Sequence, residues 1–367
     1  MPLLRLKIRN SLTSPYGLVY NRNRIISCTA KSCFYSAQIA AFRWNVGGHG
    51  NPTPGKREKA MEEERTPTTK ELTEILAKLG LLGIGEGAIQ TFTAEEDGSE
   101  YAVWRIDTGS GSCVLKRAKA FEIETYRCFF RDKKPYAPAF YGSCAFGGAA
   151  YFLMEYCPGE DLRRCEREKL KKALDPLIEM QEEFWQREAL YDSALTLEKS
   201  LAGIENRGRY LGSKRLEEVY AAFVRIYQTT PRTLCHDDLL PFNLLIGERA
   251  VLIDWEYGGL LPYPASFARL IAHGRQEEGA FFYMTREDRD FAIQYYYDGL
   301  IRKHGISFAE YRRTLDYFLF YEYCEWVMLG NRYDNRSDER YGYYRRLAEE
   351  LAAKLLQQGN DPVFQGK

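Results

Sequence analysis

The stretch CHDDLLPFNLLIGERAVLIDWEYGG, residues 235–259, sets polar side chains inside an otherwise apolar part of the chain. It contains two short apolar runs, 244–246 and 250–253, which are separated by Gly-Glu-Arg at 247–249. Apolar runs on either side of a short turn containing glycine are typical of two strands joined as a hairpin. The sequence therefore predicts a hairpin with polar residues before its first strand and after its second.

Three of those polar residues have a common chemistry. Asp238 and Asn243 precede the first apolar run and Asp254 ends the second, so the chain reversal would bring the three side chains to one end of the hairpin. Two carboxylates and an amide oxygen at one place repel each other unless a cation joins them, and oxygen ligands of this kind suit Mg²⁺ shared with substrate phosphates. Phosphoryl transfer uses such an arrangement, with one aspartate for the hydroxyl nucleophile and the other two groups for the metal.

The spacing His236-x-Asp238-x-x-x-x-Asn243, followed by Ile-Asp-Trp-Glu at 253–256, resembles the catalytic and metal motifs of the aminoglycoside phosphotransferase and choline kinase families. These are small-molecule kinases with a protein-kinase-like fold. The resemblance implies that Asp238 is the catalytic base or orients the hydroxyl, that Asn243 and Asp254 bind magnesium, and that His236 is a scaffold for the loop. The alternative is a capped hairpin with solvated acidic residues, because either motif alone occurs by chance.

A kinase also needs a nucleotide-binding lobe upstream. Gly83-Ile-Gly85-Glu-Gly87 predicts a glycine-rich turn, and three strand-like segments follow, the last of which ends at Lys116. Glycines allow backbone amides to approach phosphates, and a lysine at a strand end can reach phosphate oxygens. We therefore interpret Gly85, Gly87 and Lys116 as nucleotide-binding residues, although a lone G-x-G-x-G is equally typical of an ordinary loop.

Lys116 needs an acidic partner to hold it in position, and the segment FEIETYRCFF, 121–130, offers two. Its apolar spacing and lack of breakers predict a helix. Glu122 is favoured because E-x-x-x-Y-x-x-F resembles the second helix of the family, whereas Glu124 would face about 160° away at 100° per residue. A surface ion pair without function is the alternative for both residues.

The segment AYFLMEYCPG, 150–159, predicts a buried strand that ends at Pro-Gly, and it resembles the strand and linker that bind adenine in these families. Backbone groups near Glu155 and Cys157 would contact the adenine edge, so the side chains there matter little. The segment would form a core strand in either case.

The predicted lysine, glutamate, linker, H-x-D-x-x-x-x-N and I-D-W segments occur in kinase order between residues 83 and 256. Because the reactive residues are all intact, we expect an active enzyme. The main alternative is a catalytically silent, nucleotide-binding regulator with the same fold. A protein kinase is disfavoured because D-F-G and A-P-E segments are missing from the sequence.

Composition places the chain among ordinary globular proteins. It has 367 residues, 45% of them hydrophobic and 28% charged, and no continuously apolar stretch long enough to span a membrane. The nine cysteines are irregularly spaced without a C-x-x-C pair, which indicates reduced thiols and a cytoplasmic protein without a zinc site or a disulfide framework.

The net charge of zero hides an asymmetry along the chain. Residues 1–60 hold ten basic residues and one acidic residue, which leaves 41 of the 51 basic and 50 of the 51 acidic residues for 61–367. That acidic body disfavours nucleic acid as a partner and favours a cationic substrate weakly. We expect no nucleic-acid and no membrane partner, and the sequence leaves the oligomeric state open.

The first sixty residues differ in composition from the rest of the chain. An organellar transit peptide, a disordered basic arm and a wrongly assigned start codon are the three interpretations. We favour the last, because Arg57-Glu58 can be encoded by a purine-rich ribosome-binding sequence just before Met61. From there the chain becomes orderly, with a capping box, T-T-K-E at 68–71, before a helix.

Residues 160–228 and 264–355 are predicted to be mainly helical, and the second range is rich in aromatic residues. Those rings, with Glu322, Glu325 and Asp334, could form a cage for an ammonium group, although helix packing explains the same spacing. The sequence also departs from the family pattern. Members usually carry an aspartate shortly after the metal-binding strand, where this chain has PASFAR at 264–269.

The predicted fold class is α+β, a two-lobed protein-kinase-like fold with a β-rich N-terminal nucleotide lobe and a mainly helical C-terminal lobe. The predicted function is transfer of the γ-phosphate of Mg-ATP to a small-molecule hydroxyl of an aminoglycoside-, choline- or amino-alcohol-like acceptor. The expected divisions are an N-terminal extension, a leading helix, the nucleotide lobe, the catalytic and substrate lobe, and a tail, at residues 1–60, 61–80, 81–158, 159–358 and 359–367.

Overall fold

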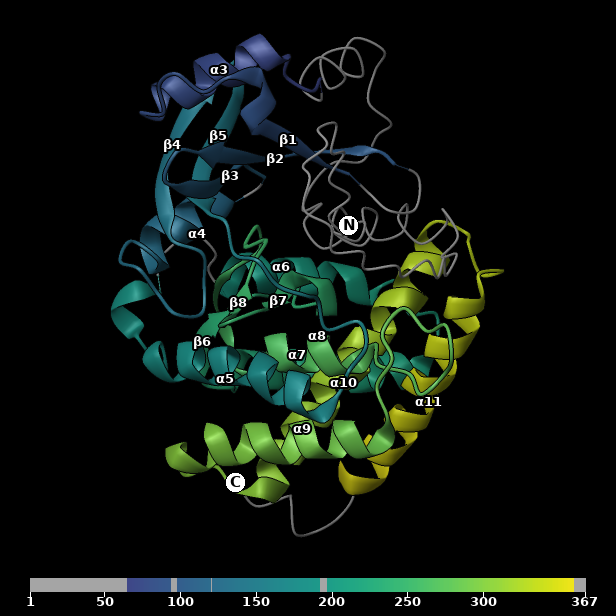
Figure 1. Cartoon of the computed structure of the whole chain (residues 1–367). Coiled ribbons are helices and arrows are strands. Elements are labelled where there is room, and N and C mark those ends of the chain that lie inside the picture. Colours follow the sequence, from purple (N-terminus) through teal and green to yellow (C-terminus); the bar gives the residue numbers. More distant parts are fainter. Residues whose placement is uncertain (1–64, 94–97, 120, 192–196, 360–367) are drawn as a thin grey trace. The chain divides into compact units, whose positions relative to one another are not determined.

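The computed structural model describes residues 65–93, 98–119, 121–191 and 197–359 (Figure 1). The predicted N-terminal extension and nearly all of the predicted tail lie outside these residues. The chain divides into two compact units. Unit 1 comprises the described residues up to Lys134 together with Pro138–Cys157, and unit 2 comprises Pro135–Ala137 and the chain from Pro158 onward.

Unit 1 is built on a five-stranded sheet with the strand order β1-β2-β3-β5-β4, in which all neighbouring strands are antiparallel. The strands are β1 Ile89–Thr93, β2 Glu100–Thr108, β3 Gly111–Arg117, β4 Phe140–Phe146 and β5 Ala149–Glu155. A short 3₁₀ turn, η1 Glu86–Ala88, precedes β1. The strands thus follow the apolar segments in the sequence, and β3 and β5 are central and most deeply buried.

Helix α3, Thr69–Lys78, covers one face of this sheet (Figure 1). Its capping box is confirmed, because the Thr68 side chain accepts from the Glu71 backbone N–H and the Glu71 carboxylate accepts from the Thr68 backbone N–H. Its apolar stripe packs into one core with the sheet; that core includes Leu72, Ile75, Leu76, Trp104, Ile106, Leu115, Tyr151 and Leu153. Burial of this stripe stabilises the helix more than its intrinsic propensity does.

Unit 2 is mainly helical (Figure 1). Its α-helices are α5 Arg167–Glu183, α6 Leu197–Gly208, α7 Lys214–Thr229, α8 Pro264–Ala272, α9 Arg286–Gly299, α10 Phe308–Arg332 and α11 Glu339–Gly359. Single 3₁₀ turns lie at η2 Glu188–Leu190, η3 Pro241–Asn243 and η4 Ile301–His304. Two small antiparallel pairs complete the unit, β6 Arg232–Cys235 with β9 Gly259–Pro262 and β7 Leu244–Ile246 with β8 Ala250–Leu252. The fold class is thus α+β, as predicted.

Helix α10 lies at the centre of unit 2, in contact with α7, α8 and α11. It is buried on most of its circumference over 25 residues, which explains its aromatic composition. Phe223 of α7, for example, stacks on Tyr321 with ring centroids 4.7 Å apart and meets Phe318 edge to face. Packing of the core therefore accounts for these aromatic residues.

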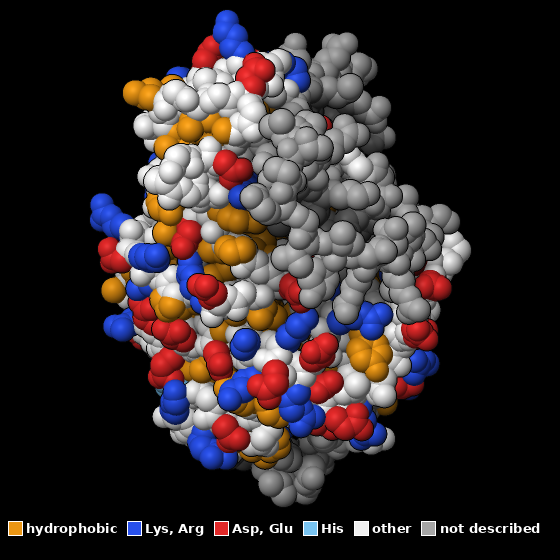
Figure 2. Space-filling model, in the orientation of Figure 1, with side chains coloured by type: hydrophobic (Ala, Val, Ile, Leu, Met, Phe, Trp, Pro, Cys, Tyr) orange, Lys and Arg blue, Asp and Glu red, His pale blue; other side chains and the backbone are white. Residues whose placement is uncertain are grey.

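The described surface of unit 2 in Figure 2 carries basic and acidic side chains interspersed among each other. A mixed surface of this kind is typical of a solvated protein face. Among the described helices, none is long and apolar enough to cross a lipid bilayer.

The turn of the β7–β8 hairpin packs against the start of unit 2 without room for a side chain. A Cβ atom at Gly247 would lie 2.3 Å from the carbonyl oxygen of Pro158, a backbone atom that cannot rotate away. We therefore predict that Gly247→Ala lowers the free energy of unfolding by about 1–3 kcal/mol, the usual cost of overpacking. Urea denaturation measures this change.

Gly109→Ala is the matched control, because no atom lies within 4 Å of its added methyl group. We expect it to change stability by less than about 0.5 kcal/mol. Equal stabilities of the two variants would show that the turn does not have the close approach described here.

Candidate active site

The loop between β6 and β7 carries the predicted catalytic residues. His236 is fully buried and its Nε2 lies 2.7 Å from the carbonyl oxygen of Ile253, while its ring packs on Trp255 with centroids 4.7 Å apart. Asp238 follows after one residue and is almost completely buried. The contacts of His236 thus join the loop to the residues that follow β8, while the scaffold role that the resemblance implies for His236 stays a prediction.

The hairpin brings Asn243 beside Asp254. Leu244 pairs with Leu252 in the β7–β8 register, and the backbone N–H of Ile253 donates to the carbonyl oxygen of Asn243 over 2.9 Å. The side-chain Nδ2 of Asn243 donates to the backbone oxygen of Asp238 over 2.8 Å. One short segment therefore collects the three polar residues that the sequence singled out.

The amide oxygen of Asn243 is the clearest indication of a ligand at this place. Asn243 is 1% exposed, and its Oδ1 has no hydrogen-bond partner among the described residues. Because a buried amide oxygen without a partner is costly, such an atom is satisfied by a group from outside the protein chain, either a water molecule or an ion. The nearby Asp254 adds a buried carboxylate.

These two groups fit a hard cation such as Mg²⁺, which takes oxygen ligands. Among the described residues, His, Cys, Asp and Glu side chains form no group of three that could hold a metal by themselves. A magnesium ion at Asn243 and Asp254 would therefore take its remaining ligands from water and phosphate, as Mg²⁺ commonly does.

The backbone of the segment is strained at two aspartates. Asp237 has φ 55° and Asp254 has φ 68°, two of the four non-glycine residues with positive φ in the described chain. Aspartate tolerates the left-handed region better than most residues, and strained positions are concentrated at functional sites. The strain at Asp254 is consistent with a carboxylate that is held in place for a ligand.

Sequence reasoning did not assign a role to Ser266, which lies in the PASFAR stretch at the start of α8. Its Oγ accepts a hydrogen bond from the backbone N–H of His236 over 2.8 Å. A hydroxyl thus anchors the loop between β6 and β7. Sequence reasoning had noted this stretch as a departure from the family pattern but had no signal for its contact with His236.

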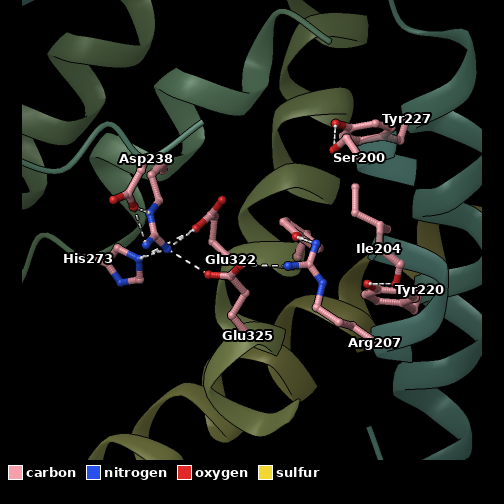
Figure 3. Close-up of polar contacts among 11 residues, drawn as sticks. Ser200, Ile204, Arg207, Tyr220, Tyr227, Asp238, His273, Glu322 and Glu325 are labelled. Atoms are coloured by element: carbon pink, nitrogen blue, oxygen red, sulfur yellow. Dashed lines mark hydrogen bonds and ion pairs between the residues drawn. The ribbon is translucent and has the colours of Figure 1, made fainter. Parts of the chain in front are cut away.

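Sequence reasoning also missed Arg269, whose buried guanidinium contacts Asp238. The carboxylates of Asp238, Glu322 and Glu325, which accept hydrogen bonds from Arg269, are labelled in Figure 3. Arg269 donates to Oδ1 of Asp238 through Nη2 at 2.8 Å and Nε at 3.2 Å. Its Nη1 donates to Glu322 Oε2 at 2.9 Å and Glu325 Oε2 at 2.8 Å. We call Arg269, Asp238, Glu322 and Glu325 the Arg269 cluster.

The acidic residues predicted to form an ammonium cage have different surroundings in the structure. Glu322 and Glu325 lie inside unit 2, where they contact Arg269, whereas Asp334 is exposed beyond the end of α10. The cation that these glutamates hold in this structure is therefore an arginine of the chain itself.

In unit 1, the register of the sheet places Lys116 opposite Val103 and Phe152. Its Nζ lies 2.6 Å from Oε1 of Glu122, the first residue of helix α4, Glu122–Phe129. Both side chains are buried. Glu122 is thus the partner of Lys116, as the resemblance to the family's second helix implied, while nucleotide binding by this pair stays a prediction.

The other predicted nucleotide contacts are less distinctive. Gly85 and Gly87 lie before and within η1, and an added Cβ at either would meet no atom within 4 Å. The backbone N–H of Glu155 donates to Ala139, so adenine would meet the Glu155 carbonyl and not its N–H. Cys157 follows β5 and is half-buried. For these four residues the role in nucleotide binding stays a prediction.

His273, one turn after Arg269 in α8, adds a titratable group beside the Arg269 cluster. Its Nε2 lies 3.3 Å from Arg269 Nη1 and its Nδ1 lies 2.8 Å from the Tyr344 hydroxyl. Burial lowers the pKa of His273 below its usual 6.5, and although Glu322 raises it, the positive charge of Arg269 lowers it further. His273 is therefore neutral near pH 7 and can accept a hydrogen bond from Arg269.

A sequence model of a phosphotransferase enzyme family (APH) matches residues 82–300, which is more than half of the chain. The match covers both the Lys116 region and the 235–259 segment.

Individual relatives are more distant. Protein LicA of Haemophilus influenzae is 26% identical over 160 residues, which are 42% of this chain and 57% of LicA. The chain thus spans about half the length of the curated relatives it matches.

Two solved structures share low sequence identity with the chain. An aminoglycoside phosphotransferase from Alicyclobacillus acidocaldarius is 14% identical, with coverage of 75% of this chain and 91% of that chain and a TM-score of 0.46. A putative fructosamine-3-kinase from Haemophilus somnus is 12% identical, with coverage of 78% and 97% and a TM-score of 0.47.

The lowered pKa of His273 predicts a dependence of stability on pH. The unfolded chain binds a proton near pH 6.5 while the folded chain resists it, so stability is complete above that pH and falls as the pH drops toward the folded-state pKa. Each such histidine contributes a slope of at most about 1.4 kcal/mol per pH unit. Urea denaturation at a series of pH values between 7.5 and 5 measures it.

The variant His273→Gln should have a smaller slope than the wild type over this range. His304→Gln is the comparison, because burial also lowers the pKa of His304. Each substitution should therefore remove the contribution of one histidine to the change of stability with pH. An unchanged slope in His273→Gln would contradict the neutral, buried state of this side chain.

Proposed function

The chain belongs to the phosphotransferase enzyme family, and we propose that it transfers the γ-phosphate of Mg-ATP to a hydroxyl group of a small molecule. The observation that supports this proposal best is the segment from His236 to Asp254. It collects two buried carboxylates and a buried amide oxygen that has no hydrogen-bond partner among the described residues. Phosphoryl transfer uses these groups in the same order along the chain.

In this proposal Asp238 accepts the proton of the acceptor hydroxyl, or orients that hydroxyl, while the oxygen attacks the γ-phosphorus. His236 holds the loop through its contacts with Ile253 and Trp255 and takes no part in proton transfer. The loop is fastened a second time by Ser266. Because His236 and Asp238 are buried and the loop is held by these contacts, Asp238 is oriented before the acceptor arrives, which is a main contribution of a protein to this reaction.

Asn243 and Asp254 would bind magnesium, which neutralises charge on the transferring phosphate. The Asn243 side chain is oriented by its hydrogen bond to Asp238, and this leaves Oδ1 for the cation. Asp254 lies two residues after the end of β8. The two ligands are thus set by the hairpin, and a change of register there would separate them.

Unit 1 would bind the nucleotide. Lys116, held by Glu122, would contact phosphate oxygens. Gly85 and Gly87 would lie at the phosphates, and the backbone at Glu155 and Cys157 would contact adenine. We propose that this nucleotide is ATP and not GTP.

For the acceptor we propose an aminoglycoside-, choline- or amino-alcohol-like compound. The support is the excess of acidic over basic residues in 61–367, which favours a cationic small molecule over nucleic acid. We place the reaction in the cytoplasm, where ATP is available. The free thiols of the described cysteines are compatible with that compartment.

The second candidate is a regulator that binds nucleotide without chemistry. It is favoured only by the distance of the relatives, because the residues that phosphoryl transfer requires are present. The two candidates differ in a single observable, acceptor-dependent turnover.

We predict that the full chain releases ADP from Mg-ATP when one member of a suitable panel is added. The panel comprises aminoglycosides, choline, ethanolamine, homoserine and simple sugars. Asp238→Asn should lower kcat by a factor on the order of 10²–10⁴, the usual contribution of a positioned base, while changing nucleotide affinity little. A coupled ADP assay and nucleotide titration measure the two effects.

Asp161→Asn is the matched control, because Asp161 also has an arginine partner in unit 2, with Arg163 Nε 2.7 Å from Oδ2. It should leave kcat unchanged. Nucleotide binding without acceptor-dependent release for any compound would favour the regulator. Equal losses of turnover and nucleotide affinity in Asp238→Asn would indicate a folding defect.

A further inference from the structure

The Arg269 cluster joins Asp238 to three buried charged residues of unit 2, Arg269, Glu322 and Glu325, to which the proposed reaction assigns no role. The side chain of Arg269 is only 2% exposed, and the side chain of each of its three carboxylate partners is at most 8% exposed. An arginine is retained in such a place only with excellent geometry, because removing two charges from water is costly.

The contact between Arg269 and Asp238 has a particular geometry. Two donors of one planar group, Nε and Nη2, both point at a single oxygen, Oδ1 of Asp238. Because the guanidinium is rigid, this pair of bonds limits rotation of the carboxylate more than a single bond from lysine would. The orientation of the Asp238 side chain therefore depends on where Arg269 lies.

Arg269 is in turn held from the opposite side by helix α10. Glu322 and Glu325 are three residues apart, so they face the same side of the helix and both accept from Nη1. Glu325 also lies 3.9 Å from Nη1 of Arg207 in α6, and Arg207 donates to the hydroxyl of Tyr321. Helices α6, α8 and α10 thus share one set of ionic contacts that ends at Asp238.

From this arrangement we propose that Arg269 is the positioning residue of Asp238, and that Glu322 and Glu325 act on the reaction through Arg269 and do not bind the acceptor. The proposal rests on the proposed function, in which Asp238 is the catalytic residue.

The competing role for the two glutamates is direct binding of a cationic acceptor, as in an ammonium cage. The charges disfavour it, because a second cation at Glu322 and Glu325 would lie beside the guanidinium that already contacts both. The rings of α10 disfavour it as well, since Tyr321 and Phe318 are engaged in contacts with α7. A cationic group of the acceptor would then be recognised by other residues.

The test is steady-state kinetics of acceptor-dependent ADP release by the full chain. The variants are Arg269→Lys, Arg269→Met, Glu322→Gln and Glu325→Gln, each examined with a cationic and a neutral acceptor where both react. Asp316→Asn is the control, because Asp316 is a buried acid of the same helix that pairs instead with Lys354 at 2.6 Å.

We expect Arg269→Met to lower kcat on the order of 10²-fold, the effect of a small misplacement of a reacting group, with both KM values nearly unchanged. Arg269→Lys should restore part of kcat, because it keeps the charge but loses the paired donors. The two glutamine variants should lower kcat to a smaller extent, equally for cationic and neutral acceptors. Asp316→Asn should behave as wild type in kcat and KM.

A rise in KM for the cationic acceptor alone, with kcat unchanged in Glu322→Gln or Glu325→Gln, would overturn the proposal and restore direct binding. An unchanged kcat in both Arg269 variants would overturn it too, although the proposed function would stand. Wild-type protein without turnover on any acceptor would instead overturn the proposed function. If Arg269→Met fails to fold, the glutamine variants and Arg269→Lys still decide between these outcomes.

Discussion

The positive charge of Arg269 is the condition on which the interior of unit 2 depends. Asp238, Glu322 and Glu325 are buried within reach of one guanidinium, and without it three carboxylates would face each other away from water. Removing one partner of a buried ion pair is strongly destabilising because a charge is left uncompensated. Folding of α8 against α10 and orientation of Asp238 are therefore parts of the same event.

The hairpin of β7 and β8 imposes the second constraint. Its two short strands would not be stable alone. The hairpin therefore depends on contacts with the rest of the chain, including backbone hydrogen bonds between Ile246 and Glu160 and between Leu252 and Tyr136. Once it is formed, Asn243 and Asp254 are neighbours whatever ligand is present. A protein that fixes its ligand-binding groups before the ligand arrives loses less free energy in ordering them.

The sequence predicted much of this structure because the relevant signals are local. Apolar runs, Gly-rich turns and a capping box located four of the five strands of the unit 1 sheet, helix α3 and the β7–β8 hairpin within a few residues, whereas β4, Phe140–Phe146, was not predicted. The choice of Glu122 as the partner of Lys116 came from the resemblance of E-x-x-x-Y-x-x-F to the second helix of the family, with Glu124 then facing about 160° away. The motif at 236–243 likewise places its residues by short spacing.

The contacts that sequence reasoning missed join residues distant along the chain. Arg269 meets Glu322 and Glu325 more than fifty residues away, and Ser266 meets His236 from another element. A single sequence contains no record of which helix faces turn toward each other. The available signal in the sequence was an arginine in an otherwise apolar stretch. The interpretation of the two glutamates as part of an ammonium cage did not consider that an arginine of the chain itself could be their cation.

Transfer of a radiolabelled γ-phosphate from ATP to an organic acceptor, in the presence of Mg²⁺, tests the central claim most directly. We predict that the full chain forms a labelled phosphate ester and that Asp254→Asn, which replaces a negatively charged metal ligand by a neutral amide of the same shape, does not. Label found only in inorganic phosphate, or an ester formed equally well by Asp254→Asn, would contradict the assignment of this site to phosphoryl transfer.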